Sequence, residues 1–236
     1  MKRILKALRS GGWRHAARIV GDRVDDFWAE RRLGISARGL IPIETLLENW
    51  KDCHDYFPTT VSSFHQFMRH VEMREGEDVF VDMGCGMGRV LVLAAQYRFQ
   101  KIIGVEVSAE LARQARRNIA NCRIPLACRN IEIWTGDARD YPIPPNATVF
   151  YFYNPFHGAI LKETFGALEK SLEANPRQIR VVFNNAVHFE KMERGLDWLV
   201  RIKTLQMEHE CVILRNSRAV SGCGSVGNDP SRRERR

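Results

Sequence analysis

The stretch VFVDMGCGMGRVL, residues 79–91, constrains the fold more than any other part of the chain. It places Gly84, Gly86 and Gly88 at alternate positions directly behind an apolar run. Glycine loses more backbone entropy on folding than any other residue, so a chain that clusters three of them needs their freedom or their missing side chain. In doubly wound α/β folds, such a turn joins the first strand to its helix and borders the ligand site.

From residue 78 onward, strand-like and helix-like segments alternate. This order predicts a mainly parallel sheet with helices on both faces. Only a short polar link separates the last two strands, so we expect them to be antiparallel. The predicted fold is a doubly wound, seven-stranded, Rossmann-like α/β sheet with an antiparallel last strand. The expected strands are 79–83, 101–107, 131–135, 148–153, 179–184, 199–205 and 210–214, and the helices between them are 89–97, 109–121 and 158–173.

The residues on either side of this region have a different character. Residues 4–33 have apolar positions at helical spacing, interrupted at residues 10–12, and predict a short basic helix followed by a longer amphipathic one. Helical segments are also expected at 43–50 and at 61–74, the second capped by Thr59 or Thr60. We therefore expect a helical N-terminal extension and cap (1–75), a ligand-binding domain (76–215) and a disordered basic tail (216–236).

The net charge of +8 belongs to the two ends. Residues 1–38 hold ten Lys/Arg and four Asp/Glu, residues 215–236 hold six and two, and residues 39–214 hold 20 and 22. Basic ends of this kind could contact nucleic acid, or an anionic membrane surface through the N-terminal basic helix; they could equally serve solubility alone.

The sequence also indicates a compartment. No apolar run reaches the roughly 18 residues of a membrane span, and the basic start lacks the pattern of a secretory signal. The six cysteines form neither a C-x-x-C pair nor a cluster with zinc spacing. We expect a cytoplasmic protein whose cysteines are reduced and buried, with no bound metal; metal binding by the cysteines is the minor alternative.

Polar groups follow each of the first four predicted strands. Asp82 precedes the glycines by two positions, Glu106 ends the second strand, Asp137 follows the third, and Asn154 follows the fourth. The carboxyl ends of parallel strands meet at one edge of a sheet, where open α/β folds bind ligands. Each residue alone could be a cap, a turn or a solvated group, but the set together predicts a ligand site.

The spacing of the glycines narrows the kind of ligand. The pattern is G-x-G-x-G followed by Arg89, whereas a dinucleotide fingerprint is G-x-G-x-x-G. Asp82 beside the turn disfavours a pyrophosphate and favours a cationic or amino-bearing group. Glu106 is placed to accept both hydroxyls of a ribose, and Asp137 to accept a hydrogen bond from an adenine amino group.

The sequence VDMGCGMG, with Glu106 at the next strand end, resembles motif I of the class I (seven-strand) S-adenosylmethionine-dependent methyltransferases. The likeness extends over about residues 78–215. It implies a methyltransferase that uses S-adenosylmethionine. By this resemblance, the methionine part would lie against Asp82 and the loop of Gly84, Cys85, Gly86 and Gly88, the ribose against Glu106, and the adenine against Asp137 and Ala138.

The acceptor is expected near the residues after the fourth strand, Tyr153-Asn154-Pro155-Phe156-His157. The triplet Asn154-Pro155-Phe156 is similar to a shortened N-P-P-Y/F loop of amino-group methyltransferases, with one proline in place of two. In those enzymes the Asn and a proline-held carbonyl accept hydrogen bonds from an amine. His157 is a candidate base, or alternatively a cap, and Asn184-Asn185 after the fifth strand points to the edge of the same pocket.

The segment Tyr56-Phe57-Pro58-Thr59, taken with D-x-G-x-G-x-G-R, resembles the non-SET protein-lysine methyltransferases. In that branch an N-terminal segment folds over the cofactor. The resemblance implies that Tyr56 and Thr59 line the site and that Arg89 ties the segment to it. The alternative for Tyr56 and Thr59 is a turn and a helix cap.

Four functions follow from these patterns. The first is methyl transfer to a nitrogen acceptor such as a protein lysine, and the second is transfer to a small molecule or glycan. Nucleic-acid methylation is supported only by the basic ends. A non-catalytic cofactor-binding protein is the fourth, and the intact acidic residues argue against it.

Overall fold

The computed structural model describes residues 26–37, 39, 41–46, 52–54, 56–187 and 189–217. The predicted short basic helix, the break after it, most of 43–50 and nearly all of the basic tail lie outside these residues. The proposed contacts of the chain ends with nucleic acid or membrane therefore stay predictions, as does the division of the chain into three parts.

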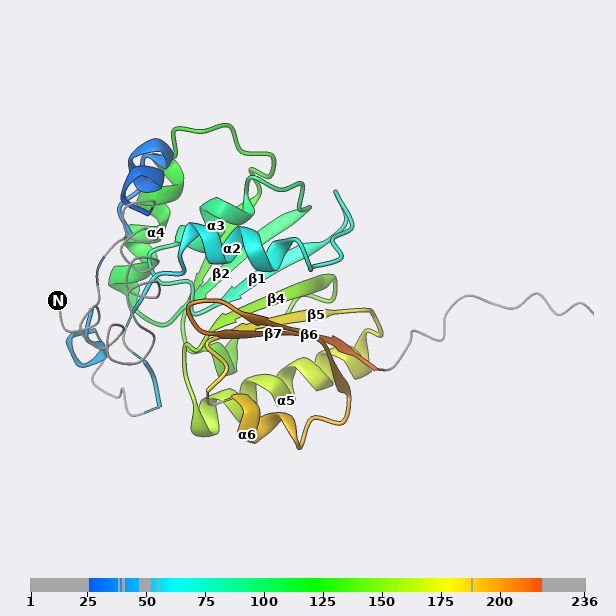
Figure 1. Ribbon diagram of the computed structural model, residues 1–236. Coiled ribbons are helices and arrows are strands. Elements are labelled where there is room, and N and C mark those ends of the chain that lie inside the picture. The colour runs from blue at the N-terminus through cyan, green and yellow to red at the C-terminus, as the bar shows by residue number, and fades with distance from the viewer. Residues whose placement is uncertain are drawn as a thin grey trace, which may run out of the picture.

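A seven-stranded sheet with the order β3-β2-β1-β4-β5-β7-β6 forms the centre of the molecule (Figure 1). Strands β1 to β5 are parallel, while β7 runs antiparallel to both of its neighbours, β5 and β6. The predicted fold class is confirmed. The strands are β1 (Val79–Met83), β2 (Lys101–Glu106), β3 (Ile131–Thr135), β4 (Ala147–Tyr153), β5 (Arg180–Asn184), β6 (Leu199–Gln206) and β7 (Glu210–Asn216).

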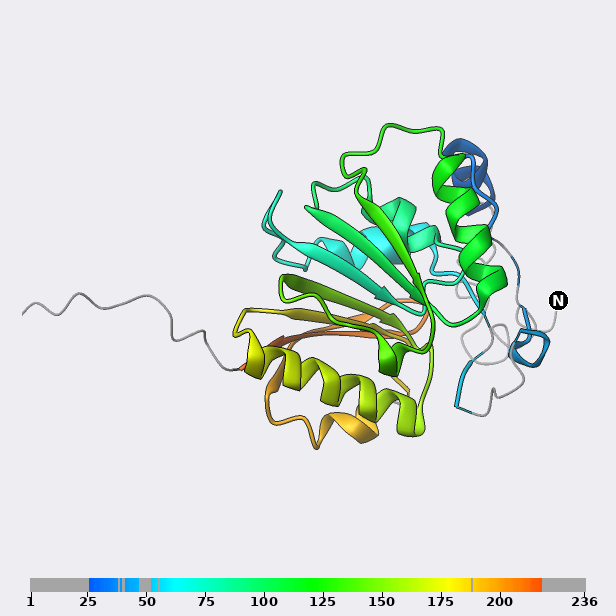
Figure 2. The same ribbon diagram turned by 180° about the vertical axis from the view of Figure 1, so that it is seen from behind.

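Helices cover both faces of this sheet (Figures 1 and 2). On one face lie α2 (Val61–Met68), α3 (Arg89–Ala94) and α4 (Ala109–Ala120), and on the other lie α5 (Gly158–Ala174) and α6 (Phe189–Glu193). Each face has its own apolar core, the first built around Phe64 and Leu91 and the second around Phe165 and Phe183. Strand β1 is buried along its whole length because it lies between β2 and β4 and both faces are covered.

Two predicted helices are shorter than expected. The helix predicted over 61–74 begins after its N-cap Thr60, whose side chain accepts the Ser63 N–H, but it ends at Met68. The helix predicted over 89–97 ends at Ala94. In both cases the helix ends in a tight i→i−3 turn. The N–H of Val71 donates to the carbonyl of Met68, and the N–H of Tyr97 donates to the carbonyl of Ala94.

Other local differences concern short elements. Residues 26–33 are helical, as the amphipathic pattern predicts, whereas the predicted helix at 43–50 is described only as a 3₁₀ turn, η1 (Ile43–Thr45). Neither α6 nor the 3₁₀ turn η2 (Ala138–Asp140) was predicted. Both are too short to show a helical period.

Gly88 is required by packing between two helices. It stands at the N-cap of α3 with φ +77°, and a Cβ there would lie 2.9 Å from the Cβ of Ala115 in α4. A side chain would therefore strain the backbone and push α4 away. Gly166, inside α5, has no atom within 4 Å of the position of a Cβ apart from its chain neighbours and the backbone of its own helix.

These two glycines give a matched test. We expect Gly88→Ala to lower the free energy of unfolding by about 2 kcal/mol or more, because left-handed backbone and overpacking both cost energy. Gly166→Ala should raise it by about 1 kcal/mol, the helix propensity difference. Urea unfolding of both variants measures the two values; a Gly88→Ala variant as stable as the native chain would contradict the packing argument.

Candidate active site

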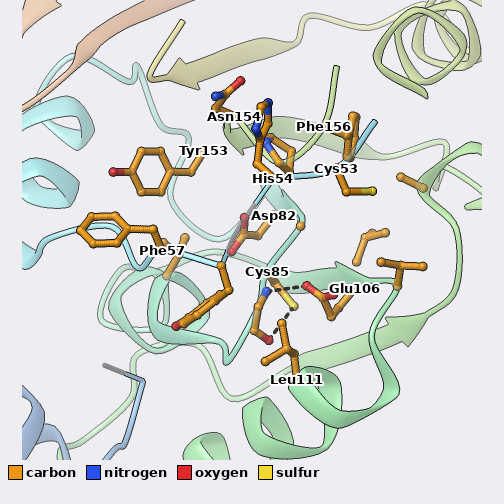
Figure 3. A pocket seen from close by; sticks show the side chains of 18 of the residues that line it. Cys53, His54, Phe57, Asp82, Cys85, Glu106, Leu111, Tyr153, Asn154 and Phe156 are labelled. Atoms are coloured by element: carbon orange, nitrogen blue, oxygen red, sulfur yellow. Dashed lines mark hydrogen bonds between the residues drawn. The ribbon is translucent and has the colours of Figure 1, made fainter. Parts of the chain in front are cut away.

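A cavity opens at the carboxyl edge of β1, β2 and β4, and Leu46 and residues 53–54 and 56–59 line it from the N-terminal side (Figure 3). Every residue that the sequence assigned to cofactor or acceptor lines it except Gly88; His157, Asn184 and Asn185 also lie outside the lining. The predicted residues that line it are Tyr56, Thr59, Asp82, Gly84, Cys85, Gly86, Arg89, Glu106, Asp137, Ala138, Tyr153, Asn154, Pro155 and Phe156. Their ligand contacts stay predictions.

The glycine loop is also approached by other parts of this chain. A Cβ on Gly84 would lie 2.5 Å from the Cβ of Pro155, and one on Gly86 would lie 2.2 Å from the ring of Tyr56. The sequence interpretation gave the space beside the glycines to the ligand alone. The structure shows that part of that space is occupied by Pro155 and Tyr56. Pro155 belongs to the loop after β4 (residues 153–157, the acceptor loop), and Tyr56 belongs to the N-terminal cap.

Glu106 fixes the glycine loop to the end of β2. Its carboxylate accepts the N–H of Gly86 at 2.8 Å (Figure 3). It also accepts the N–H of Ser108 at 2.9 Å. Burial raises the pKa of Glu106, although the backbone donors act in the opposite direction. A ribose at this position would meet a carboxylate whose orientation is already set.

Asp82 is the acidic group nearest the centre of the cavity, between Glu106 on one side and Asn154 on the other (Figure 3). The residue is only 2% exposed, and no described residue donates a hydrogen bond to its carboxylate. Burial, and secondly the charge of Glu106, raise the pKa of Asp82 well above its ordinary value. A positively charged or amino-bearing ligand would relieve this unfavourable burial.

Asp137 begins the η2 turn after β3. Its carboxylate accepts the backbone N–H of Arg139 at 2.9 Å and forms an ion pair with the same guanidinium at 2.6 Å. These hydrogen bonds lower the pKa of Asp137. The turn-forming role considered for Asp137 is present, and the carboxylate also borders the cavity, where the adenine contact stays a prediction.

A hydrogen-bonded group that sequence reasoning missed joins the cap to the sheet. The buried hydroxyl of Tyr151 in β4 shares a 2.6 Å hydrogen bond with the hydroxyl of Thr59 and accepts one from Asn184 at 3.2 Å. Tyr151 lies in register with Asp82. A signal existed, because Tyr151 and Tyr153 are two positions apart on one strand and share a face.

Arg89 holds the cap in place from the first turn of α3. Its guanidinium is 2% exposed and forms ion pairs with Asp26 at 2.7 Å and with Glu30. It also donates to the carbonyl of Thr59 at 3.2 Å. The tie between Arg89 and the N-terminal segment, which the resemblance implied, is therefore an ion-pair network.

The acceptor loop has an unusual conformation at Asn154. This residue has φ +42°, is 9% exposed, and its Oδ1 has no hydrogen-bond partner among the described residues. Positive φ outside glycine and an unsatisfied buried oxygen both cost energy, and such costs gather at functional sites. The carbonyl of Pro155 already accepts the N–H of His54 at 3.1 Å, so Asn154 is the free acceptor of the pair.

Comparison with known proteins agrees with this geometry. Residues 80–173 match a family model described as a methyltransferase domain. This part of the chain is similar to a methyltransferase domain. The methyl donor of such domains is S-adenosylmethionine, and the buried Asp82 and the backbone cradle at Gly84 and Gly86 suit a ligand with an amino group and a sulfonium.

A curated relative is a protein-lysine N-methyltransferase of Saccharolobus islandicus strain REY15A, 32% identical over 65 residues. The match spans 27% of this chain and 40% of the relative, so the chain covers less than half of that protein. Among solved structures, ribosomal protein L11 methylase from Lactobacillus delbrueckii subsp. bulgaricus matches with a TM-score of 0.50 and 14% identity over 68% of this chain and 80% of that chain.

Geranyl diphosphate C-methyltransferase from Streptomyces coelicolor A3(2), solved with S-adenosyl-L-homocysteine, matches with a TM-score of 0.50 and 15% identity. The match covers 67% of this chain and 80% of that one. At this identity, both structural matches show the fold of the methyltransferase domain and nothing finer.

Two kinds of feature are absent from the described residues. None of their helices has the length and apolar content needed to cross a membrane. Within the same part of the chain, no three His, Cys, Asp or Glu side chains gather in a way that could hold a metal ion.

The pKa of Asp82 is raised and that of Asp137 is lowered, so the two residues should affect the pH dependence of stability in opposite directions. Because the pKa of Asp82 is raised in the folded state, the fold binds more protons than the unfolded chain, and stability falls as pH rises from Asp82's ordinary range through its raised pKa. Asp82→Asn should therefore raise the Tm at pH 8, with a smaller gain near pH 4.

Asp137→Asn is the control, with the opposite sign. The lowered pKa of Asp137 means that its contribution is present above the ordinary range and is lost as pH falls through the lowered pKa. This variant should therefore lower the Tm slightly at pH 8 and lose its effect near pH 3. Thermal unfolding followed by circular dichroism measures the Tm of both variants. If Asp82→Asn has a Tm below the native value at pH 8, burial of the Asp82 carboxylate does not destabilise the fold.

Proposed function

We propose that this chain is an enzyme that transfers the methyl group of S-adenosylmethionine to a nitrogen acceptor, the side-chain amine of a protein lysine. The observation that carries this proposal is the Oδ1 of Asn154, which lines the cavity, is buried and has no partner among the described residues. Its backbone is held at φ +42°. An amine N–H is the donor that this oxygen lacks.

The cofactor would supply an electrophilic methyl group on a sulfonium, and the residues at the strand ends would hold it. Asp82 would accept hydrogen bonds from the amino group, and the backbone of Gly84 and Gly86 would lie along the methionine part. Glu106 would accept the ribose hydroxyls and Asp137 the adenine amino group. These assignments follow the order in which β1, β2 and β3 deliver the residues to one edge of the sheet.

The chain's own contribution to the reaction would be alignment. Methyl transfer to nitrogen requires the lone pair of the amine to point along the bond that breaks, so positioning supplies much of the rate. A hydrogen bond from the amine to Asn154 would fix one N–H direction and thereby orient the lone pair. The walls beside it, including Phe156 and Tyr153, would exclude water.

The lysine acceptor has two supports besides Asn154. The Saccharolobus islandicus relative is described as a protein-lysine N-methyltransferase, although it matches over only 65 residues. In addition, the segment of Tyr56 to Thr59 lies over the cavity and is tied to α3 by Arg89, as the resemblance to the non-SET lysine enzymes implied.

The same segment favours a second candidate, a small-molecule acceptor. Its backbone pairs with the acceptor loop, through a bridge between Cys53 and Phe156 and the hydrogen bond from His54 to Pro155. A segment fixed in this way covers part of the cavity, and a covered site suits a small acceptor better than a protein chain.

Radiolabelled cofactor distinguishes the two acceptors. Purified protein would be incubated with methyl-labelled S-adenosylmethionine and a cell lysate, half of it desalted to remove small molecules. We expect label in protein from both halves, recovered as methyl-lysine after acid hydrolysis. Label that appears only in small molecules and disappears on desalting would contradict the protein-lysine acceptor.

Substitution of Asn154 tests its role directly. We expect Asn154→Ala to lower the methyl-transfer rate by about 10- to 100-fold, the cost of one positioned hydrogen bond of about 1.5–3 kcal/mol. Affinity for S-adenosylhomocysteine, measured by calorimetry, should stay within threefold. Asn146→Ala, an exposed asparagine before β4, is the matched control and should leave both values unchanged. Equal rates for the two variants would remove Asn154 from the mechanism.

A further inference from the structure

Three titratable side chains meet where the cap pairs with the acceptor loop: Asp52, His54 and His157. The backbone places them there, because the His157 N–H donates to the Asp52 carbonyl at 2.8 Å and the His54 N–H donates to the Pro155 carbonyl at 3.1 Å. As a result, the rings of His54 and His157 face each other, with centroids 4.9 Å apart and planes at 56°. Two segments about 100 residues apart in sequence thus contribute to one cluster.

The cluster runs from the cavity to solvent. His54 lines the cavity and lies on the same side of Asp82 as Asn154 (Figure 3). The side chain of His157 is 32% exposed and that of Asp52 is 42% exposed. The Nδ1 of His157 lies 3.7 Å from the carboxylate of Asp52. The order is therefore a cavity-lining imidazole, a second imidazole behind it, and a carboxylate at the surface.

The proposed reaction creates a need for such a path. A lysine amine has an ordinary pKa near 10.4, so it arrives protonated at neutral pH and must lose a proton before its lone pair can react. The other ionisable side chains on this side of the cavity are poor acceptors. Burial raises the pKa of the Cys53 thiol and keeps it neutral, and the proposed function already assigns Asp82 to the amino group of the cofactor. Histidine is the side chain whose ordinary pKa lies near neutrality.

We propose that His54 is the general base that deprotonates the acceptor amine, and that His157 and Asp52 carry its proton to solvent. This rests on the proposed function. The proton passes from the ammonium nitrogen to the His54 imidazole, and the freed lone pair forms the N–CH₃ bond while the electron pair of the S–CH₃ bond stays on sulfur. The His54 imidazolium then releases its proton to water through His157. His54 is the catalytic residue; His157 and Asp52 position and discharge it.

His157, the candidate base in the sequence, lies one step further from the cavity than His54. His157 is the N-cap residue of α5, makes no side-chain capping bond and does not line the cavity. Its contact with the ring of His54 gives it the second place in the path instead of the first. A cluster with a purely structural role would hold the cap against the acceptor loop in the same way. The experiment must therefore measure proton transfer.

The kinetic arm measures single-turnover methyl transfer from labelled S-adenosylmethionine into desalted lysate protein between pH 5.5 and 9. We expect His54→Gln to lower the rate at pH 7 by about 100-fold or more, as removal of a general base does, and to abolish the acidic limb of the profile. His157→Gln and Asp52→Asn should cost less and shift that limb. His70→Gln, an exposed histidine after α2, should change nothing. A His54→Gln rate within threefold of native, with the limb intact, would overturn the proposal.

The second arm needs no turnover. Histidine ring signals in NMR spectra of the intact protein, assigned by their loss in the His54→Gln and His157→Gln variants, give the pKa of each imidazole. We expect the measured His54 pKa to shift by at least half a unit in His157→Gln, because the substitution replaces an imidazole whose centroid lies 4.9 Å from that of His54. If His54 titrates identically in the native protein and in His157→Gln, the proposed proton path is overturned, even when the enzyme is active.

The two arms separate failure of this inference from failure of the proposed function. If the native chain methylates nothing, the methyltransferase proposal fails, while the coupled titration still decides whether the three groups form one path. If the native chain is active and His54→Gln matches it, only the general base is lost. Calorimetry with S-adenosylhomocysteine, expected to be unchanged in His54→Gln, shows that the variant is folded.

Discussion

The buried guanidinium of Arg89 is the constraint on which the site depends. A charge that is 2% exposed must be paired, and its partners Asp26, Glu30 and the Thr59 carbonyl all come from the N-terminal segment. The segment must therefore lie against α3. Because Arg89 directly follows the glycine loop, the same interaction sets the cap and the loop at a fixed distance, and it brings Tyr56 onto Gly86.

The edge of the sheet is built at a cost in stability. Asp82 and Glu106 are both buried carboxyls with raised pKa, and Asn154 combines positive φ with an unsatisfied oxygen. The apolar cores on the two faces of the sheet hold β1, β2 and β4 in register, and their burial offsets the unfavourable free energy of these groups. Each strained group faces one cavity, which is the reason to assign them to binding and chemistry and not to folding.

The sequence predicted the strands of this fold to within two residues at each end, because buried parallel strands are short apolar runs bounded by turn signals. It predicted helix ends less well: the tight turns after Met68 and Ala94 depend on where the chain must go next, which local pattern does not record. Tyr151 was missed as a site residue although it shares a strand face with Tyr153, because its hydrogen bond with Thr59 joins residues 92 positions apart and is seen only in the tertiary structure.

The sequence by itself determined the order of the elements and the side chains at the carboxyl ends of the strands, because both follow from periodicity and from residue type. Only the tertiary structure decided what fills the space beside the glycines, which histidine borders the cavity and how the cap is held. Those outcomes depend on contacts between segments far apart in the chain, such as Tyr56 with Gly86 and His54 with His157. Such contacts are set by packing and backbone pairing in three dimensions, and no local pattern carries them.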